Sequence, residues 1–380
     1  MKILLITYSR TRNYGGILQS YGLYKYLKLN NNDVDFIDYI PRRCNINNKK
    51  EFVDEAASKS NLWGKNFLTK WIFSLLRYPA MRRTFSSFLN FMNENATFTK
   101  PYYSIDELCL DVPEADVYIT GSDQVWNSQF STNKELDLPF YLPFVKDAKK
   151  ISYASSFGRD SIPDKDREIV QNLLEQYDSI SVRENSGKEI LRSMGIDSEV
   201  TVDPTILCPL EVWNVIADKR LDTNYILLYQ VTFNPQIYQL AKAVAAAEGK
   251  KMIIITLDSK DKRKMKKGNI KIAPAVEDWL SYIKYADGVI TDSFHASVFS
   301  ILFKRKFVII SGTRKEMSTR ISNLLNSVSL NSKEVNSFCV EEVLNVLNQS
   351  VDWDECHNKL NSLRIESKEW LDKALTKSEL

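Results

Sequence analysis

The feature that most constrains the fold is a repeated alternation between short runs of β-branched and aromatic residues and longer stretches with helical periodicity. Such alternation is typical of parallel sheets, in which a helix connects each strand to the next. In the first part of the chain it predicts a helix over Ile17–Leu29 within a doubly wound domain. The strands expected there are Lys2–Thr7, Asp33–Asp38, Val117–Thr120, Ile151–Ala154, Ser179–Val182 and Val200–Val202.

The alternation restarts after Asp203 and Pro204, which predicts a second α/β unit. Its expected strands are Tyr225–Gln230, Lys251–Thr256, Gly288–Thr291 and Phe307–Ile310, and its expected helices are Pro235–Glu248, Glu277–Tyr285, Ser297–Phe303 and Ile321–Leu325. Because single cores stop growing at roughly 250–300 residues, two domains are expected. The sequence therefore predicts an α/β fold with two Rossmann-like domains, residues 1–208 and 209–350, facing a cleft. Residues 351–380, with an amphipathic helix over Trp353–Ala374, are expected to pack back on the first domain.

The amino-acid composition limits which cellular compartment and which kinds of partner are expected for this protein. A net charge of +3 is too small to make nucleic acid the principal partner. The five cysteines show no CxxC pair, which suits a reducing compartment, and the two histidines cannot assemble a histidine-based metal cluster. The sequence shows no secretory signal and no apolar stretch of about 18 residues. We therefore expect a cytoplasmic protein without a transmembrane helix or a metal.

A basic and aromatic segment at about residues 56–98 lies outside the alternation. Ala56–Asn93 contains no aspartate or glutamate. Its cations are Lys59, Lys65, Lys70, Arg77, Arg82 and Arg83, interleaved with Trp63, Phe67, Trp71 and Phe73. Such a helix suits the surface of an anionic membrane, or it is an insertion that packs its apolar face on the first domain. We weigh packing above membrane contact.

Two loops that follow predicted strands carry side chains suited to a sugar. In Asn13–Gln19, the candidate residues are Asn13, Gly15, Gly16 and Gln19. Paired glycines let the backbone approach a ligand, although such a pair also serves simply to make the turn. In Thr120–Asn127, Asp123 and Asn127 suit sugar hydroxyls and Trp126 offers an apolar face. A turn that caps the next helix uses similar residues, so both interpretations stay open.

Two further strand ends carry cationic or titratable side chains. Arg183 ends the strand Ser179–Val182, where a guanidinium is placed to bind a carboxylate or phosphate; a link to Glu184 or to a neighbouring helix is the alternative. His295 lies in Thr291–Ser297, within the first turn of the helix that follows a strand. We favour a functional histidine there. His357, on the C-terminal helix, is interpreted as structural, and Arg320 is expected to begin the helix Ile321–Leu325.

Read in order, these segments resemble the polysaccharide pyruvyl transferase family over roughly residues 1–330. The matching segments are Asn13–Gly16 with Leu18-Gln19, Ile37–Tyr39, Gly121–Asn127, Tyr153–Gly158, Ser181–Glu184, Val202–Thr205, Ala286-Asp287 and Thr291–His295. The sequence departs from the family at Ala296, where glycine is frequent, and at Lys306, where proline is common. Neither change removes a reactive group, so we expect activity to survive.

The resemblance implies a GT-B-like fold and an enzyme that takes phosphoenolpyruvate as co-substrate, with no other cofactor. It implies transfer of the pyruvyl group to a hexose of a polysaccharide precursor, either free or lipid-linked, as a ketal with release of phosphate. Residues 1–208 are then the acceptor side and residues 209–350 the donor side. A peripheral contact with the inner membrane surface fits a lipid-linked acceptor.

The resemblance carries over His295, Arg183 and Arg320 as residues that hold the donor. Together with the residue chemistry above, we expect His295 and Asp123 to act in catalysis. The expected donor-binding residues are Arg183, Arg320, Ser293 and Ser297, and the expected acceptor-binding residues are Asn13, Gly15, Gly16, Gln19, Trp126 and Asn127.

Two other functions remain alternatives. A GT-B nucleotide-sugar glycosyltransferase commonly holds the ribose diol with a carboxylate, but Ala296–Phe303 contains no aspartate or glutamate. A non-catalytic sugar-binding protein of an assembly complex would expose an aromatic patch without a convergent basic pocket.

Overall fold

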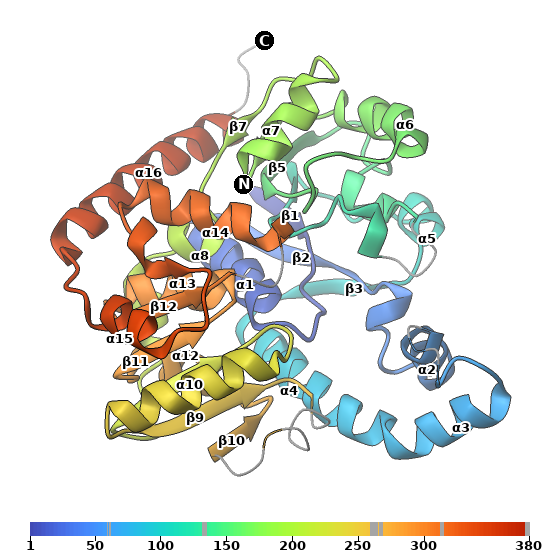
Figure 1. The fold of residues 1–380 in the computed structure, drawn as a ribbon. Helices are drawn as coiled ribbons and strands as arrows, with labels where there is room; N and C mark the ends of the chain where they lie inside the picture. The colour runs from blue at the N-terminus through green and yellow to red at the C-terminus, as the bar shows by residue number, and fades with distance from the viewer. Residues whose placement is uncertain are drawn as a thin grey trace. The chain divides into compact units, whose positions relative to one another are not determined.

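The computed structural model describes residues 1–58, 60, 62–130, 135–258, 265, 269–311 and 315–376. By its internal contacts the chain forms two compact units (Figure 1). Unit 1 comprises Met1–Cys208 together with Ile365–Leu380, and unit 2 comprises Pro209–Arg364.

Unit 1 is built on a parallel sheet whose strand order is β3-β2-β1-β4-β5-β6-β7. Every described strand pair in this sheet is parallel. The order reverses direction between β1 and β4, as it does in doubly wound Rossmann folds. The strands are β1 (Lys2–Ile6), β2 (Asp33–Tyr39), β3 (Phe98–Tyr102), β4 (Val117–Thr120), β5 (Lys149–Ser155), β6 (Ser179–Val182) and β7 (Glu199–Val200).

The central strands of unit 1 form because both of their faces are covered. All four residues of β4 are buried, as are Ile3–Ile6 of β1. Near-continuous apolar runs of this kind are typical of parallel strands with helices on both sides. The core they build includes Leu4, Ile6 and Tyr118, packed with aromatic residues such as Phe140.

The helices of unit 1 follow the connections between strands. They are α1 (Tyr14–Leu29), α2 (Lys49–Ser58), α3 (Phe67–Leu76), α4 (Tyr78–Asn95), α5 (Ile105–Leu110), α6 (Asp164–Leu174), α7 (Asn185–Arg192) and α8 (Pro204–Leu207), with short 3₁₀ turns at Arg42–Cys44, Ser128–Phe130 and Leu138–Tyr141. The predicted start of the first helix at Ile17 is three residues late. Asn13 has extended backbone and its side chain accepts from the Gly15 N–H, so it caps a helix that begins at Tyr14.

The basic and aromatic segment forms the helices α2, α3 and α4, which begin at Lys49, earlier than the predicted position 56. These helices share a small core of their own. Its buried members are Ile46, Phe52, Val53, Ala57, Phe73, Tyr78 and Phe85. The insertion therefore packs partly on itself, which the sequence did not predict. It also packs on the first domain through α4, where the Phe88 ring lies 4.8 Å from that of Tyr14 in α1, as one of the two interpretations expected. These contacts account for only part of its apolar surface.

Unit 2 repeats the plan of unit 1. Its strand order is β10-β9-β8-β11-β12-β13, again parallel in every described pair, and it reverses between β8 and β11. Its strands are β8 (Tyr225–Tyr229), β9 (Lys251–Thr256), β10 (Asn269–Ile272), β11 (Gly288–Thr291), β12 (Phe307–Ile310) and β13 (Glu334–Val335). Its helices are α9 (Leu210–Ile216), α10 (Pro235–Ala247), α12 (Val276–Lys284), α13 (Phe294–Leu302), α14 (Lys315–Ser327) and α15 (Val340–Asn348), with a 3₁₀ turn at Asn331–Lys333.

The last helix, α16 (Trp353–Leu375), contributes residues to both units. Its C-terminal part packs on unit 1. The Ser367 hydroxyl accepts from the backbone N–H of Val202 at 3.0 Å, and the Trp370 ring lies 6.3 Å from that of Tyr153. Among the described residues, no helix combines the length and the apolar character needed to cross a bilayer.

The edge strands are where the sequence prediction was incomplete. It did not find β3, β10 or β13, which lie at the edges of their sheets. β3 contains Lys100 and Pro101, and β13 has two residues, so neither shows a strand pattern. The prediction that Arg320 begins a helix is wrong, because α14 begins at Lys315 and Arg320 lies inside it.

Candidate active site

The two predicted sugar-binding loops meet at the switch point of unit 1. One follows β1 and the other follows β4, and these strands are neighbours. A Cβ atom added at Gly16 would lie 2.6 Å from Thr11 Cγ2 and 3.3 Å from Asp123 Oδ2. A side chain at position 16 would therefore clash with Thr11 of the same loop, and it would crowd Asp123 of the second loop. In doubly wound folds, this edge of the sheet is where ligands bind.

Asp123 is the partly accessible carboxylate of this edge. Its backbone has φ of 79°, a left-handed conformation that aspartate tolerates better than most residues. One carboxylate oxygen accepts from the Gln124 N–H at 2.8 Å, and 18% of the side chain is exposed. The Asp123 side chain is thus held in one orientation, and part of it remains accessible to solvent.

Asn13 and Asn127 also lie at this edge. Asn13 is exposed, and its carbonyl oxygen accepts from the Gly15 N–H at 2.9 Å. Asn127 is half-buried; its amide donates to Gln124 Oε1 at 3.0 Å, and its carbonyl oxygen accepts from the Gln129 N–H at 3.0 Å. Gly15 is buried in the first turn of α1.

The Trp126 and Gln19 side chains are buried, which argues against direct contact with a sugar; their acceptor role stays a prediction. The Trp126 ring is buried between Tyr141 and Phe157, with centroids 6.0 and 5.1 Å away, and its N–H donates to the Phe140 carbonyl. The Gln19 side chain is fully buried and donates to Thr7, Gly16 and Ser20. Both side chains lie beneath the two loops and make contacts within the protein.

Arg183 lies beneath the same edge of the sheet and is surrounded by carboxylates. Its side chain is only 2% exposed, and its guanidinium nitrogens lie 3.0 Å from Asp203, 3.7 Å from Glu184 and 3.9 Å from Asp123. Burial disfavours the charged guanidinium, but the nearby carboxylates outweigh it, so the pKa of Arg183 is raised. The link to Glu184 is therefore present and buried, and the cation is already matched by carboxylates.

A second, partly buried network was not predicted from the sequence. The hydroxyl of Tyr8, two residues after the end of β1, accepts from Arg43 at 2.8 Å, and Arg43 pairs with Asp137 at 2.7 Å. Tyr39 donates to the same Asp137 at 2.5 Å. Burial, partly offset by Arg43, raises the pKa of Tyr8, so it is a neutral phenol at physiological pH. Its position at a strand end was the one available signal, because Arg43 and Asp137 come from distant parts of the sequence.

His295 lies at the switch point of unit 2. β8 and β11 are neighbours there, and the Asp292 carboxylate joins their loops by accepting from the Val231 N–H at 2.7 Å. Ser293 caps α13, and His295 is its second residue, half-buried, with its ring 5.1 Å from that of Phe294. The predicted first-turn position is confirmed.

The two serines assigned to the donor are used within α13. The Ser293 hydroxyl accepts from the Ala296 N–H at 3.3 Å, and the Ser297 hydroxyl donates to the Ser293 carbonyl at 2.8 Å. Ser297 is fully buried, which argues against direct contact with the donor; its donor-binding role stays a prediction. Arg320 is half-buried. His357 bonds the Ile301 carbonyl at 2.9 Å through Nε2, in agreement with a structural role.

Each unit therefore brings part of the predicted set together. Unit 1 gathers Asn13, Gly16, Asp123 and Asn127 at one sheet edge above Arg183, and unit 2 places His295 at the N-terminus of α13. In the described ranges, no group of three or more histidine, cysteine, aspartate or glutamate residues is arranged to hold a metal ion.

These features define an α/β protein with a doubly wound sheet in each of two units and polar residues at both switch points. A family model described as polysaccharide pyruvyl transferase matches residues 13–313, most of the chain. The chain therefore belongs to the polysaccharide pyruvyl transferase family. No protein with a curated description matches it.

Solved structures match the fold over almost the full length. The UDP-GlcNAc 2-epimerase from Neisseria meningitidis, bound to UDP-GlcNAc, is 11% identical, with 98% of this chain and 100% of that chain covered and a TM-score of 0.51. The S. aureus MnaA–UDP structure is 12% identical, with 100% and 98% covered and a TM-score of 0.51. UDP-N-acetylglucosamine 2-epimerase from Rickettsia bellii is 11% identical, with 98% and 95% covered and a TM-score of 0.51. At such identities the likeness shows the fold alone, which is GT-B-like.

Proposed function

We propose that this protein transfers the pyruvyl group of phosphoenolpyruvate to two hydroxyls of a hexose in a polysaccharide precursor, forming a ketal and releasing phosphate. The observation that carries the proposal is the position of His295, at the N-terminus of α13 and the switch point of unit 2, in a chain of the pyruvyl transferase family. Because phosphoenolpyruvate is a cytoplasmic metabolite, the reaction would take place in the cytoplasm.

The donor is proposed to bind at unit 2. The backbone N–H groups in the first turn of a helix favour a phosphate, and α13 begins at Phe294 directly after its cap. His295 is in that turn, so its imidazole would lie within reach of a phosphate held there. Arg320 is proposed as a further cation for the donor.

The acceptor is proposed to bind at the sheet edge of unit 1. The partly exposed Asp123 carboxylate is the candidate to accept a proton from a sugar hydroxyl, and Asn13 and Asn127 are candidates to orient the sugar. Arg183 is proposed to hold the Asp123 carboxylate in place, a positioning role that its burial favours over direct contact with the donor.

The proposed reaction balances without an oxidant or a further co-reactant. Addition of one sugar hydroxyl to C2 of phosphoenolpyruvate forms a C–O bond, and its proton equivalent appears on C3, which becomes a methyl group. The second hydroxyl then displaces phosphate from C2, and its proton leaves with the phosphate. Both the addition and the displacement are helped by a base at the hydroxyl and an acid at the donor.

His295 is proposed as the acid on the donor side. A bound phosphate dianion favours an imidazolium beside it, and that group can protonate C3 or assist the departure of phosphate. Positioned acid–base catalysis contributes roughly 10²–10⁴ in rate. His295→Ala is therefore expected to fold normally and to lose about that factor in kcat.

The test is phosphate release from phosphoenolpyruvate across a panel of hexosides, with NMR of the product to detect the ketal methyl group. His357→Gln is the matched control, because it changes the other histidine, which bonds a backbone carbonyl of α13. It should keep the wild-type kcat. Wild-type turnover by His295→Ala would refute the role of His295, and the absence of any ketal with the wild-type enzyme would refute the function.

Thermal shift separates the proposal from a nucleotide-sugar glycosyltransferase. α13 carries no aspartate or glutamate with which to hold a ribose diol. A ligand at about 100 times its Kd stabilises a protein by roughly 2.7 kcal/mol. Phosphoenolpyruvate should raise the melting temperature and nucleotide sugars should not. The reverse pattern would favour the glycosyltransferase, and no response to either would favour a sugar-binding scaffold.

A further inference from the structure

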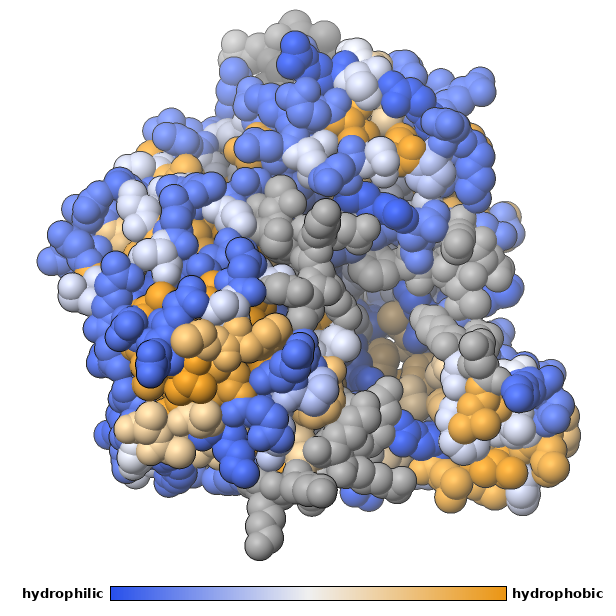
Figure 2. Space-filling view, viewed as in Figure 1, coloured by the Kyte–Doolittle hydropathy of each residue, from blue (hydrophilic) through white to orange (hydrophobic). Residues whose placement is uncertain are grey.

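Helix α3 faces two different environments. Phe73 is buried in the small core of the insertion, with the Trp63 ring 5.9 Å away. Phe67, Trp71 and Leu75 follow one another at intervals of four and so share the outer face. Phe67 is 84% exposed and Trp71 is 53% exposed. Figure 2 shows apolar side chains gathered at the lower right, where Figure 1 places α3.

The outer face of α3 is more than a scatter of single apolar residues. The exposed large apolar side chains of this segment are Leu62, Phe67, Leu68, Trp71, Leu75 and Leu76. We call these residues the α3 patch. Contiguous exposed apolar surface of this kind marks an interaction site in soluble proteins. Packing on the insertion core therefore explains Phe73 and leaves the patch unexplained.

The charges within the segment that carries the patch are of one sign. Ala56–Asn93 contains no aspartate or glutamate, and Lys65, Arg82 and Arg83 are exposed there. Lys70 pairs with Asp54 of α2 at 2.8 Å, so that nearby carboxylate is matched. The patch thus lies in a basic field that favours an anionic partner.

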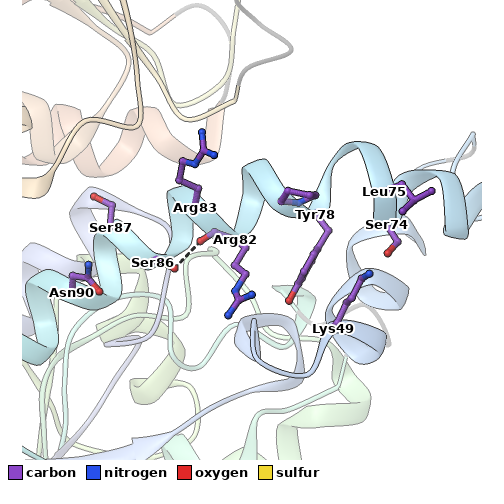
Figure 3. A pocket seen from close by; sticks show the side chains of 10 residues that line it. Lys49, Ser74, Leu75, Tyr78, Arg82, Arg83, Ser86, Ser87 and Asn90 are labelled. Atoms are coloured by element: carbon purple, nitrogen blue, oxygen red, sulfur yellow. Dashed lines mark hydrogen bonds between the residues drawn. The ribbon is translucent and has the colours of Figure 1, made fainter.

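An open groove of about 890 Å³ lies beside the patch. Figure 3 shows Lys49 and Arg82 on the same side of α4, with Tyr78 between them, while Arg83 points to the other side. The groove is lined by Lys49, Ser74, Leu75, Tyr78, Pro79, Arg82, Arg83, Ser86, Ser87 and Asn90. Its lining combines cations with hydroxyl and amide groups and includes no carboxylate, so it suits a phosphate-containing headgroup.

We propose that the α3 patch and this groove dock the protein on a membrane surface that bears acidic phospholipids. The patch would enter the boundary between headgroups and acyl chains, as the apolar face of an interfacial helix does. Lys49 and Arg82 would contact lipid phosphates. An anionic bilayer is the partner that matches both features, because it offers apolar depth and negative charge side by side.

Docking deepens the proposed function. It rests on that function for the hexose acceptor, and it adds that this acceptor is carried on a lipid. A surface on unit 1 that holds the protein to a bilayer would then keep the acceptor loops near that lipid-linked sugar. The docking itself is independent of which reaction the protein catalyses.

The test is co-sedimentation of the full chain with vesicles of phosphatidylcholine alone and of phosphatidylcholine mixed with phosphatidylglycerol. The wild-type protein should bind the mixed vesicles at least tenfold more tightly, and added salt should weaken that binding. Phe67→Gln combined with Trp71→Gln should abolish it. Arg82→Gln should weaken binding to the mixed vesicles about fivefold, as expected for one cation near an anionic surface.

Matched controls come from elsewhere on unit 1. Leu110→Gln changes an apolar residue that is 87% exposed, and Arg192→Gln removes an exposed arginine from α7. Neither should alter vesicle binding. An equal loss in these controls, or equal binding to both kinds of vesicle, would overturn the proposal.

Two further measurements distinguish membrane docking from dimerisation and from failure of the proposed function. If sedimentation of the wild-type protein shows a dimer that Phe67→Gln with Trp71→Gln converts to a monomer, and vesicles are not bound, the patch joins two copies and the lipid proposal is wrong. Phosphate release with a soluble hexoside should be unchanged in the patch variants. If no protein releases phosphate but vesicle binding follows the predicted pattern, the proposed function fails and the docking stands.

Discussion

At the scale of single residues, the electrostatics of unit 1 are set by three carboxylates around one guanidinium. Asp203, Glu184 and Asp123 all lie within 4 Å of Arg183, and the arginine side chain is 2% exposed. Asp203 also caps α8 by accepting from the Thr205 N–H at 2.9 Å. We therefore expect this buried cation to matter for folding as well as for the geometry of Asp123.

Removing this cation is expected to destabilise unit 1 strongly. Arg183→Met should cost about 3–5 kcal/mol, because buried carboxylates would be left unmatched. Denaturant unfolding measures the loss. Adding Asp203→Asn should recover part of it, since asparagine keeps the cap on α8 without the charge. A fully stable Arg183→Met protein with weakened phosphoenolpyruvate binding would instead support the direct donor contact expected from the sequence.

Trp126 offers a test of burial against sugar binding. Trp126→Ala should cost about 3–5 kcal/mol through the cavity it leaves. Trp126→Phe should keep enough aromatic packing for the protein to fold, with an unchanged KM for the hexose acceptor. Steady-state kinetics across acceptor concentrations measures that KM. A rise in KM at unchanged stability would mean that the ring contacts the sugar.

At the scale of elements, helix ends carry much of the polar chemistry. Asn13, Asp203 and Ser293 cap α1, α8 and α13 with side-chain oxygens. At the other end of a helix, the buried Lys333 donates to the carbonyls of Val346 and Gln349, which end α15. A cation there satisfies the free carbonyls and complements the helix dipole.

The pH dependence of stability should report Lys333. Burial, and then the like charge of Lys306, lowers its pKa from 10.5 to about 8. Between these values the unfolded chain binds a proton that the native protein does not, so stability should rise as the pH increases from about 8 towards 10. Above that range it should fall, because burial raises the pKa of Tyr21 and of Tyr26 to about 12.

Denaturant unfolding at a series of pH values measures this profile, and Lys333→Met is the variant that isolates it. The variant loses the two hydrogen bonds and should be less stable overall. Its stability should rise less between pH 8 and 10 than that of the wild-type protein, because burial also lowers the pKa values of Lys150 and Lys284 and they still contribute. An identical rise in the variant would show that another group titrates.

At the scale of the whole molecule, α16 joins the two units through one continuous helix. Leu360 and Leu371 are both buried, the first in the part of α16 that belongs to unit 2 and the second in the part that belongs to unit 1. Each leucine should therefore stabilise the unit against which its part of the helix packs.

Leu371→Ala and Leu360→Ala form a matched pair. Each should cost about 2–5 kcal/mol. Hydrogen exchange followed by mass spectrometry should show faster exchange in β5 for Leu371→Ala and in α13 for Leu360→Ala. Equal acceleration in both units from either change would contradict the assignment of α16 to two packing surfaces.

The amino-acid sequence alone determined the two parallel sheets, because buried parallel strands are continuous apolar runs that can be recognised locally. Val117–Thr120, Ser179–Val182 and Gly288–Thr291 were predicted with their observed ends. The first-turn position of His295 was likewise readable from a strand followed by a helix. Edge strands such as β3 were not, because their pairing depends on a neighbour more than on their own pattern.

Only the tertiary structure decided which polar residues are accessible. Trp126, Gln19 and Ser297 are in segments with the right chemistry, but their burial is set by side chains that are distant in the sequence. The carboxylates around Arg183 and the pairing of Arg43 with Asp137 likewise join separate elements. The local sequence pattern specifies the strands and the helix ends. Burial and charge pairing arise only when those elements pack against one another. Whether a side chain is free to contact a ligand or is used within the fold therefore depends on the tertiary structure.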